Sequence, residues 1–412
     1  MFTSFKYNLL ILVWVGLPLI TSAQIGDSLI SRVPQDTSRS QLNMDAVYSR
    51  PFLAVGKTPV ALGGYLEVNS LYSGEDGINE GLSFQARRLT MFMAASISKR
   101  IRFLTELEFE EGGREINIEF AAMDVAFHPA LNFRGGIIMN PIGAFNQNHD
   151  GPKWEFIERP DVAVNLLTAT WSNPGFGFYG KVHKSNWVLG YEAYFSNGFD
   201  NSIINNELSK TYLPASKNNI ERFEESNNGQ PLITAKTALK NRKIGEIGLS
   251  YMGGVYNTFE LDGLELEQRS RLDVIALDFN TTIRKSGTYI VGEAAVVMVE
   301  VPETYSQQFG TNQRGFFVDV VQPLLRRKVL DWENASLNVA FRVDHTDWNT
   351  DSFNETGEEI GDELWAITPA ISFRPSQRTV FRLNYRYQWQ WDLLNNPPAH
   401  YAAWMFGVST YF

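Results

Sequence analysis

Three carboxylates occupy every second position in part of the segment 101–111: Glu106, Glu108 and Glu110. Carboxylates two residues apart share one face of a β-strand, where in principle they could work as an acid–base pair. A simpler interpretation is that these carboxylates line a polar interior, where arginines of adjacent strands neutralise their charges. We therefore expect no catalytic role for them and predict that the protein is not an enzyme.

The histidines do not form a catalytic or metal-binding motif. His345 lies beside Asp344 and Asp347 and would be the histidine of a barrel-embedded hydrolase with Ser, His and Asn. No nearby serine stands out as its nucleophile. A residue near the rim of a sheet is the simpler interpretation. The chain has no cysteine, and no group of ligands has the spacing of a metal site. We predict neither a cofactor nor a metal.

Strands with period-two alternation would position such charges. In 378–392, Arg382 and Arg386 alternate with aromatic and aliphatic residues, and 334–348 alternates in the same way. One face of each strand then meets hydrocarbon, while the other lines a water-filled lumen that tolerates charge. The alternation predicts the following interior side chains: Arg102, Glu106, Glu108, Arg342, Asp344, Arg382 and Arg386.

Strand-like stretches recur from residue 60 onwards, and we expect about sixteen of them, an even number as in single-chain bacterial barrels. The fold class predicted is all-β, a transmembrane antiparallel β-barrel. The expected strands are near 60–72, 83–97, 101–111, 116–128, 131–139, 175–183, 186–196, 231–240, 243–256, 268–283, 286–301, 313–323, 334–348, 361–374, 378–392 and 401–412.

The connections between these strands alternate in length. Short turns are expected at 98–100, 128–130, 183–185, 241–243, 284–287 and 375–378, with a longer one at 324–333. Longer polar segments are expected at 73–82, 140–174, 197–230, 257–267, 302–312, 349–360 and 393–400. Short periplasmic turns at one rim and long extracellular loops at the other are typical of outer-membrane barrels, whereas a soluble β-sandwich would not sort its loops in this way.

The C-terminal strand has the pattern of a barrel-closing strand. One of its sides carries Trp404, Phe406, Val408, Thr410 and the terminal Phe412. An aromatic girdle is expected at the loop-side ends of neighbouring strands, where rings with one polar edge favour the membrane interface. Its members would be Trp365, Trp389, Trp391 and Trp404.

The N-terminus indicates export. Residues 1–23 have a lysine, an apolar core and small residues before Gln24, which is typical of a cleaved signal peptide. Residues 24–58 are polar and are expected to form a periplasmic extension with little structure of its own, followed by the barrel at 59–412. After residue 23 no apolar stretch is long enough for a transmembrane helix. The net charge of −10 argues against a nucleic-acid partner.

The loop 140–174 is expected to narrow the lumen. Sixteen strands leave a wide aqueous channel, and this loop contains aromatic and aliphatic residues that need burial. They are Phe145, Trp154, Phe156, Leu166, Leu167 and Trp171. The charged residues that it would present to the lumen are His149, Asp150, Lys153, Glu155, Glu158, Arg159 and Asp161. The alternative for this loop is an extracellular lid that packs on its own neighbours. The second long loop, 197–230, is expected to be a mobile outward loop.

Residues 60–412 resemble the phosphate-selective porin O and P family, above all in the stretch 101–180. The segments that carry the resemblance are LTELEFEEGGREINIEFAAMDVAFHPALNFRGGIIMNPIGAFNQNHDGP, ERPDV and the C-terminal strand. The resemblance implies a sixteen-stranded, trimeric channel that admits anions past a ladder of lumenal arginines. It adds Arg134 to the predicted pore-lining residues, as a ladder member with Arg102, Arg342, Arg382 and Arg386. The lysine cluster of the family's constriction has no counterpart in the loop.

Two hypotheses follow from these observations. The first is a passive diffusion channel of the Gram-negative outer membrane for small hydrophilic or anionic, phosphate-like solutes. The second is a closed barrel that serves as a binding or structural platform through its long loops. The expected partners are small hydrophilic solutes, outer-membrane lipid and lipopolysaccharide, and further copies of the chain in a homotrimer.

Overall fold

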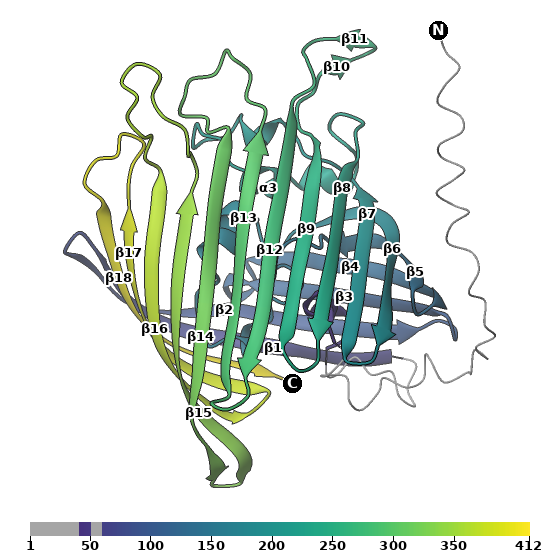
Figure 1. The fold of residues 1–412 in the computed structure, drawn as a ribbon, viewed down its shortest axis with the longest axis vertical. Helices are drawn as coiled ribbons and strands as arrows, with labels where there is room; N and C mark the ends of the chain where they lie inside the picture. The colour runs from purple at the N-terminus through teal and green to yellow at the C-terminus, as the bar shows by residue number, and fades with distance from the viewer. Residues whose placement is uncertain (1–40, 51–59) are drawn as a thin grey trace. The chain divides into compact units, whose positions relative to one another are not determined.

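In the computed structural model, residues 41–50 and 60–412 are described (Figure 1). The predicted signal peptide lies outside the described residues, as does most of the predicted N-terminal extension. No helix in the described ranges is long and apolar enough to cross a membrane.

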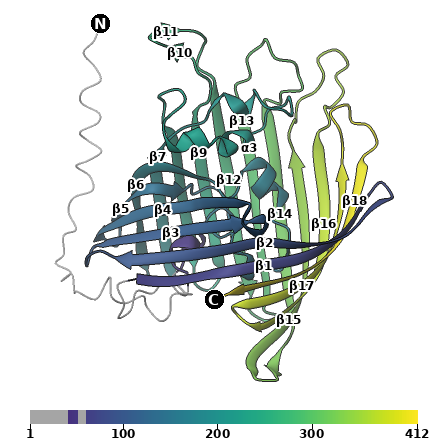
Figure 2. The ribbon, with the colours of Figure 1, turned by 180° about the vertical axis from the view of Figure 1, so that it is seen from behind.

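A closed antiparallel barrel of sixteen strands makes up most of the described part of the chain, which confirms the predicted fold class (Figures 1 and 2). The first strand pairs with the last, with Tyr65 opposite Tyr411, so the sheet has no free edge. The strands are β1 (Val60–Glu75), β2 (Ile78–Ser96), β3 (Ile101–Glu110), β4 (Glu115–His128), β5 (Leu131–Met139), β6 (Ser172–Lys184), β7 (Trp187–Ser196), β8 (Leu232–Asn241), β9 (Gly245–Val255), β12 (Arg271–Ile283), β13 (Thr288–Val299), β14 (Asn312–Val329), β15 (Trp332–Asp347), β16 (Glu363–Ser376), β17 (Thr379–Gln390) and β18 (Ala399–Tyr411).

Side chains alternate between the outer and inner faces of the barrel, as predicted. In β17, Arg382 and Asn384 are buried inside, whereas Leu383 between them is 42% exposed. Exposure of this large apolar outer face to water would be unfavourable, so the surface fits a lipid environment. The predicted aromatic girdle is only partly regular. Trp365 lies opposite Trp389, but Trp391 lies just beyond the end of β17 at Gln390.

Connection lengths differ between the two ends of the barrel, with the long loops at the top of Figure 1. The prediction of a long segment at 73–82 is wrong, because β1 and β2 pair up to Glu75 and Ile78. The turn consists of Asp76 and Gly77, with φ angles of 46° and 84°. Asp-Gly is a favoured sequence for a two-residue hairpin turn, because both positions need positive φ.

The prediction of a longer turn at 324–333 is also wrong. β14 continues to Val329 and pairs with β15, with Val329 opposite Trp332, so only two residues form the turn. The pairing shifts register at two points, around Pro323 and again around Lys328, and these irregularities obscure the alternation in the sequence. Within the loop 256–270, β10 (Glu260–Leu261) and β11 (Leu264–Glu265) form a separate small hairpin.

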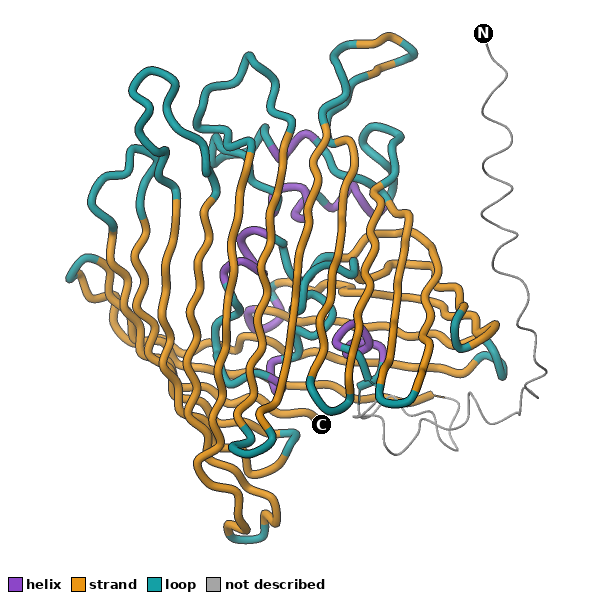
Figure 3. Tube along the Cα trace, viewed as in Figure 1, coloured by secondary structure: helices purple, strands orange, loops and turns teal. Residues whose placement is uncertain are grey.

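The loop 140–171 folds into the barrel, and its helical turns lie within the ring of strands in Figure 3. The six large apolar side chains predicted to need burial are all buried, and Trp171 has no exposed surface. The segment Val162–Leu166 packs against β13, β14 and β15, and Gly151–Lys153 packs against β1 and β18. The alternative of an external lid therefore does not describe this loop.

The loop 197–231 is anchored as well, contrary to the expectation of a mobile outward loop. Phe199, Ile203 and Leu213 are buried in the same apolar cluster as Trp171. Ile203 ends the short helix Asn201–Ile203, and Leu213 caps α3 (Pro214–Asn218). A further short helix spans Ile220–Phe223. The abundance of Asn, Ser and Glu in the sequence concealed these few apolar anchors.

Residues 41–50 contact the barrel wall, which differs from the expectation of little structure in this segment. They include the 3-10 helix η2 (Asn43–Tyr48), in which Met44, Val47 and Tyr48 are buried. Leu42 and Met44 pack against Val188 and Ala238 of β7 and β8. The segment also binds the loop 140–171, because the backbone N–H of Val47 donates to the carbonyl of Gln147 at 3.1 Å.

Candidate pore constriction

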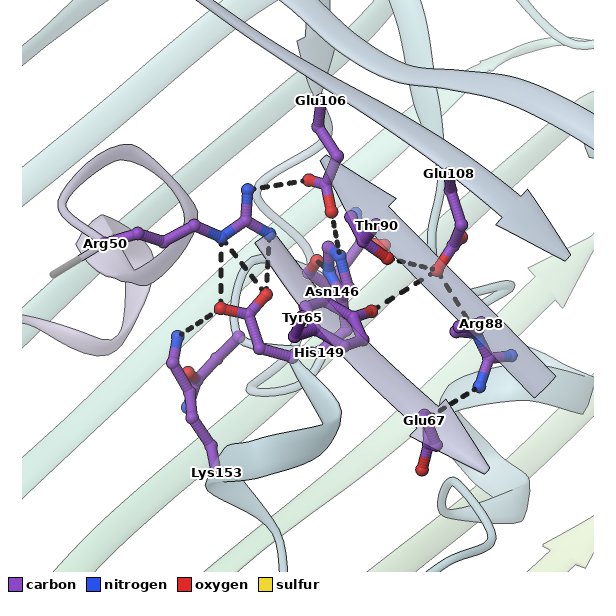
Figure 4. A network of polar contacts seen from close by, with 12 residues as sticks. Arg50, Tyr65, Glu67, Arg88, Thr90, Glu106, Glu108, Asn146, His149 and Lys153 are labelled. Atoms are coloured by element: carbon purple, nitrogen blue, oxygen red, sulfur yellow. Dashed lines mark hydrogen bonds and ion pairs between the residues drawn. The ribbon is translucent and has the colours of Figure 1, made fainter. Parts of the chain in front are cut away.

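The constriction candidate is centred on Arg50, which connects three separate parts of the chain (Figure 4). Its guanidinium lies 2.8 Å from a carboxylate oxygen of Glu106 in β3 and 2.6 Å from one of Asp150 in the loop 140–171. All three side chains are fully buried. The guanidinium also stacks on the ring of Phe92, 3.6 Å from its centre. The N-terminal segment, the loop and the wall are thus held together by one cation.

Asp150 is the anionic centre of this cluster. It accepts a hydrogen bond of 2.6 Å from the hydroxyl of Tyr411 and lies 3.3 Å from the ammonium of Lys153. Burial alone would raise the pKa of Asp150, but the charge of Arg50 outweighs this effect and holds the pKa well below its usual range. The carboxylate therefore stays ionised at neutral pH and keeps its partners.

His149, Asp150 and Glu106 bring three potential ligand atoms within 4.8 Å of one another. Side chains of the chain itself already contact these carboxylates, because Arg50 binds both of them and Nε2 of His149 lies 3.5 Å from Glu106. A metal ion would have to displace Arg50 from a fully buried position, at the cost of an unpaired charge. The expectation of no metal remains a prediction.

A second chain of charges runs along the wall next to this cluster. Arg88 of β2 lies 3.2 Å from Glu108 and 3.4 Å from Glu67 of β1. Glu67 in turn binds Arg382 of β17 at 2.7 Å, so this pairing crosses the point where the barrel closes. Arg159 of the loop approaches Glu108 at 3.9 Å. The predicted wall residues therefore bind each other and the loop.

Arginines of β15 and β17 also bind the loop. Arg342 of β15 makes two hydrogen bonds of 2.6 and 2.7 Å with Asp319 and donates another to the carbonyl of Glu158. Arg386 pairs with Asp161 of the loop and lies 3.5 Å from Asp344. Multiple donors in a planar fork allow Arg342 to bind a carboxylate and a backbone carbonyl together.

The remaining predicted residues are also paired. Arg102 and Arg134 share Asp124 at 3.1 and 2.7 Å. Glu155 binds Arg374 at 2.7 Å, and Glu158 binds Arg87 at 3.0 Å. All members of the predicted arginine ladder thus have a carboxylate partner. The following wall or segment residues of the network were not predicted from the sequence: Arg50, Glu67, Arg88, Asp319 and Arg374. Alternation along β14 and β16 could have revealed the last two.

Cavities lie on both sides of the loop. Those of about 480 and 330 Å³ lie at the short-turn side, and both are lined by Lys153 and Tyr289. A cavity of about 620 Å³ at the long-loop side is lined by Arg87, Arg114 and Glu158. Another of about 680 Å³ is lined by Asp161 and Trp391, among others. The loop residues 152–161 therefore divide the space inside the barrel.

His345 has partners that differ from those of a hydrolase. Its Nε2 lies 3.2 Å from a carboxylate oxygen of Glu363, and its ring packs on Trp365 at 4.2 Å between centres. A catalytic histidine needs a nucleophile within hydrogen-bond reach. The position of this ring near the end of β15 fits a rim residue.

Among the comparisons with known proteins, only solved structures bear on the fold of the whole chain. No family model matches the chain. An uncharacterized protein of Aquifex aeolicus (strain VF5) is 31% identical over 149 residues, which are 34% of this chain and about a third (33%) of that protein. This match covers too little of either chain to indicate a function.

Solved structures of outer-membrane proteins cover most of the chain. The anion-selective porin from Comamonas acidovorans is 11% identical, covers 86% of this chain and 99% of its own, and has a TM-score of 0.52. Salmonella typhi OmpF in complex with daunomycin is 11% identical, with coverage of 86% and 97% and a TM-score of 0.52. The trimer form of OmpT of Vibrio cholerae is 8% identical, with coverage of 86% and 100% and a TM-score of 0.50. The fold is therefore that of sixteen-stranded outer-membrane porins.

Proposed function

We propose that the protein is an outer-membrane porin, a passive diffusion channel for small hydrophilic solutes, exported with the signal peptide 1–23. The observation that carries the proposal is a closed sixteen-stranded barrel with a charged interior, narrowed by its own loop 140–171. A barrel of this size is wide enough for an aqueous channel. The apolar outer face fits a lipid environment and the polar inner face fits water.

The constriction would be formed by the loop and the facing walls. Among the predicted wall residues, Arg342 and Arg386 contact the loop at Glu158 and Asp161. Cavities on both sides of residues 152–161 supply space for solute and water. Lys153, Glu158 and Arg159 keep part of their side chains exposed, so they are the loop charges that a passing solute would meet. A mixed set of charges favours small polar solutes over apolar ones.

Anion selectivity is the finer form of the proposal. Its support is the resemblance to phosphate-selective porins and the fold shared with an anion-selective porin. Against a strong preference stands the pairing of Arg102, Arg134, Arg342, Arg382 and Arg386 with carboxylates. We therefore propose a weak anion preference. A homotrimer in contact with outer-membrane lipid and lipopolysaccharide completes the proposal, supported by the fold shared with a trimeric porin.

The second candidate is a closed barrel that acts as a binding platform. The observation in its favour is the burial of Arg50, Glu106 and Asp150 beneath the N-terminal segment and the loop. In this case the interior would be a structural core, and the long loops would bind a partner.

Single-channel recording in planar bilayers separates the two candidates. The porin proposal predicts stepwise conductance. Under a gradient of a chloride salt, the reversal potential should shift slightly towards the equilibrium potential of chloride. Replacing chloride by phosphate then measures the preference for oxyanions. A purified, folded protein that inserts but never conducts would reject the porin proposal and support the platform.

A further inference from the structure

The cavity of about 680 Å³ among the long loops, which we call the outer cavity, combines aromatic and amide side chains. The end of β17 supplies Gln388 and Gln390, and Trp391 follows directly after them. Tyr212 comes from the long loop before β8, and Trp348 from the loop after β15. The volume lies within the range of about 300–1,000 Å³ that is usual for small-molecule sites. The outer cavity therefore has the size of a ligand site.

The aromatic side chains of the outer cavity offer both apolar faces and polar edges. Tyr212 and Trp391 are half-buried, and neither the hydroxyl of Tyr212 nor the indole N–H of Trp391 makes a hydrogen bond with a described residue. Trp348 is held in place, because its indole N–H donates to the carbonyl of Asn165 at 3.2 Å. Rings of this kind pack on an apolar surface and hydrogen-bond at their edge. A ligand with C–H faces and hydroxyl groups matches both properties.

The amides of β17 form a short ordered row beside these rings. Nε2 of Gln388 donates to Oε1 of Gln390 at 3.3 Å, and Oε1 of Gln388 accepts from Arg386 at 3.0 Å. The amide nitrogen of Gln390 donates to no described residue, and its side chain is exposed. An amide offers donors and an acceptor together, and a hydroxyl group likewise both donates and accepts. The row is thus suited to hydroxyl groups.

The charged side chains of the outer cavity are already engaged. Asp161 pairs with Arg386, and Lys210 lies 2.9 Å from Asp362. Asp392 accepts hydrogen bonds from its own turn. An organic cation would be attracted by aromatic rings next to unpaired carboxylates, and an anion by unpaired cations. Because the lining offers neither, it favours a neutral ligand.

We propose that the outer cavity binds neutral sugars, as mono- or disaccharides. The rings of Tyr212 and Trp391 pack on the C–H face of a pyranose, and burial of these faces stabilises the complex. The free donors of Tyr212, Trp391 and Gln390 bind its hydroxyl groups and set its orientation. The inference deepens the proposed function, on which it rests for the class of solute, but binding in the cavity does not require conduction.

Saturation-transfer NMR of the full chain with maltose, in a detergent without a sugar headgroup, tests the proposal. We expect transfer to the ring protons of maltose and a dissociation constant that can be titrated. Trp391→Leu should weaken binding by about tenfold, because it removes the stacking face and the indole donor. Trp391→Phe retains a ring and should weaken binding less. The matched control is Trp389→Leu, two residues away on the outer face of β17 opposite Trp365, and it should leave binding unchanged.

Absence of transfer to maltose in the wild type would overturn the proposal, as would equal losses in Trp391→Leu and Trp389→Leu. Displacement of maltose by an equal concentration of choline would assign the cavity to organic cations and also overturn it. If Trp391→Leu does not fold, as judged by loss of urea resistance, Tyr212→Phe takes its place and should weaken binding by about threefold.

Conductance of the same samples is read separately. Absence of current rejects the porin proposal, whereas transfer to maltose decides the outer cavity.

Discussion

Interior charges of this barrel form pairs between parts of the chain that are far apart in the sequence. Arg50 joins the N-terminal segment to Glu106 and Asp150, and Arg382 joins the last hairpin to Glu67 of the first strand. Breaking a buried pair by removing one partner is costly, because the other charge stays buried and unpaired. Each pair therefore fixes a position of the loop or of the barrel closure.

Arg50→Ala tests this role. The change leaves Glu106 and Asp150 without their common cation, so we expect a loss of about 3–5 kcal/mol in the free energy of unfolding. We also expect larger and noisier single-channel currents, because Asp150 anchors the loop. Urea unfolding in lipid vesicles measures the first effect. The exposed Arg284→Ala is the control and should change stability by about 0.5 kcal/mol or less; equal effects of both changes would contradict the role of Arg50.

Glu158 predicts a pH dependence. Burial would raise its pKa, but the charge of Arg87 outweighs burial and lowers the pKa from 4.5 to about 2. A lowered pKa means that the contact contributes fully above pH 4.5 and is lost as the pH falls towards 2. We expect constant current noise from pH 7 to about 5 and a rise below about pH 4.

The variant Glu158→Gln provides the comparison for this titration. It lacks the ionisable group, so its current noise should already be raised at pH 7 and should change less on acidification. A wild-type noise that rises between pH 7 and 5 would contradict the assignment to Glu158.

Sequence alternation located part of this network. It predicted Arg342, Arg382 and Glu106 as interior residues, because period-two patterning determines the face of a strand. It could not predict Arg50, which precedes the first strand in a segment without periodicity. It also could not predict the partners, because the pairs depend on which strands become neighbours and where the loop folds.

At the level of elements, the strands were predictable and the connections less so. Strand type follows from local alternation, whereas the fate of a long loop depends on a few anchoring side chains such as Phe199 and Leu213. The hairpin at Asp76-Gly77 had a readable turn signal, which the surrounding polar residues concealed. The turn at 330–331 was obscured by the register shifts in its strands.

Gly77 gives a prediction at this level. A side chain at this position would have open space around it, so only the φ angle of 84° opposes substitution. Gly77→Ala should therefore cost about 1 kcal/mol of stability, while Gly77→Asn should cost less because asparagine tolerates positive φ better. Urea midpoints of the folded barrel measure both changes, and equal costs for Ala and Asn would contradict the turn assignment.

For the whole molecule, the central question is whether the filled barrel still contains a route for water. The strand number implies a wide lumen, but the loop 140–171, the loop 197–231 and residues 41–50 occupy much of it. In the proposed channel the loop would control the passage, because cavities lie on both sides of residues 152–161.

The most direct test compares single-channel conductance of the intact chain with that of a variant whose residues 143–168 are replaced by a short Gly-Ser linker. We predict that the intact protein conducts in stable steps and that the variant conducts several times more, because the loop packs inside the barrel and would narrow the proposed channel. Folding of both proteins is verified by their resistance to urea. If the intact, folded protein passes no current and only the variant does, the protein is a closed barrel and the channel account is contradicted.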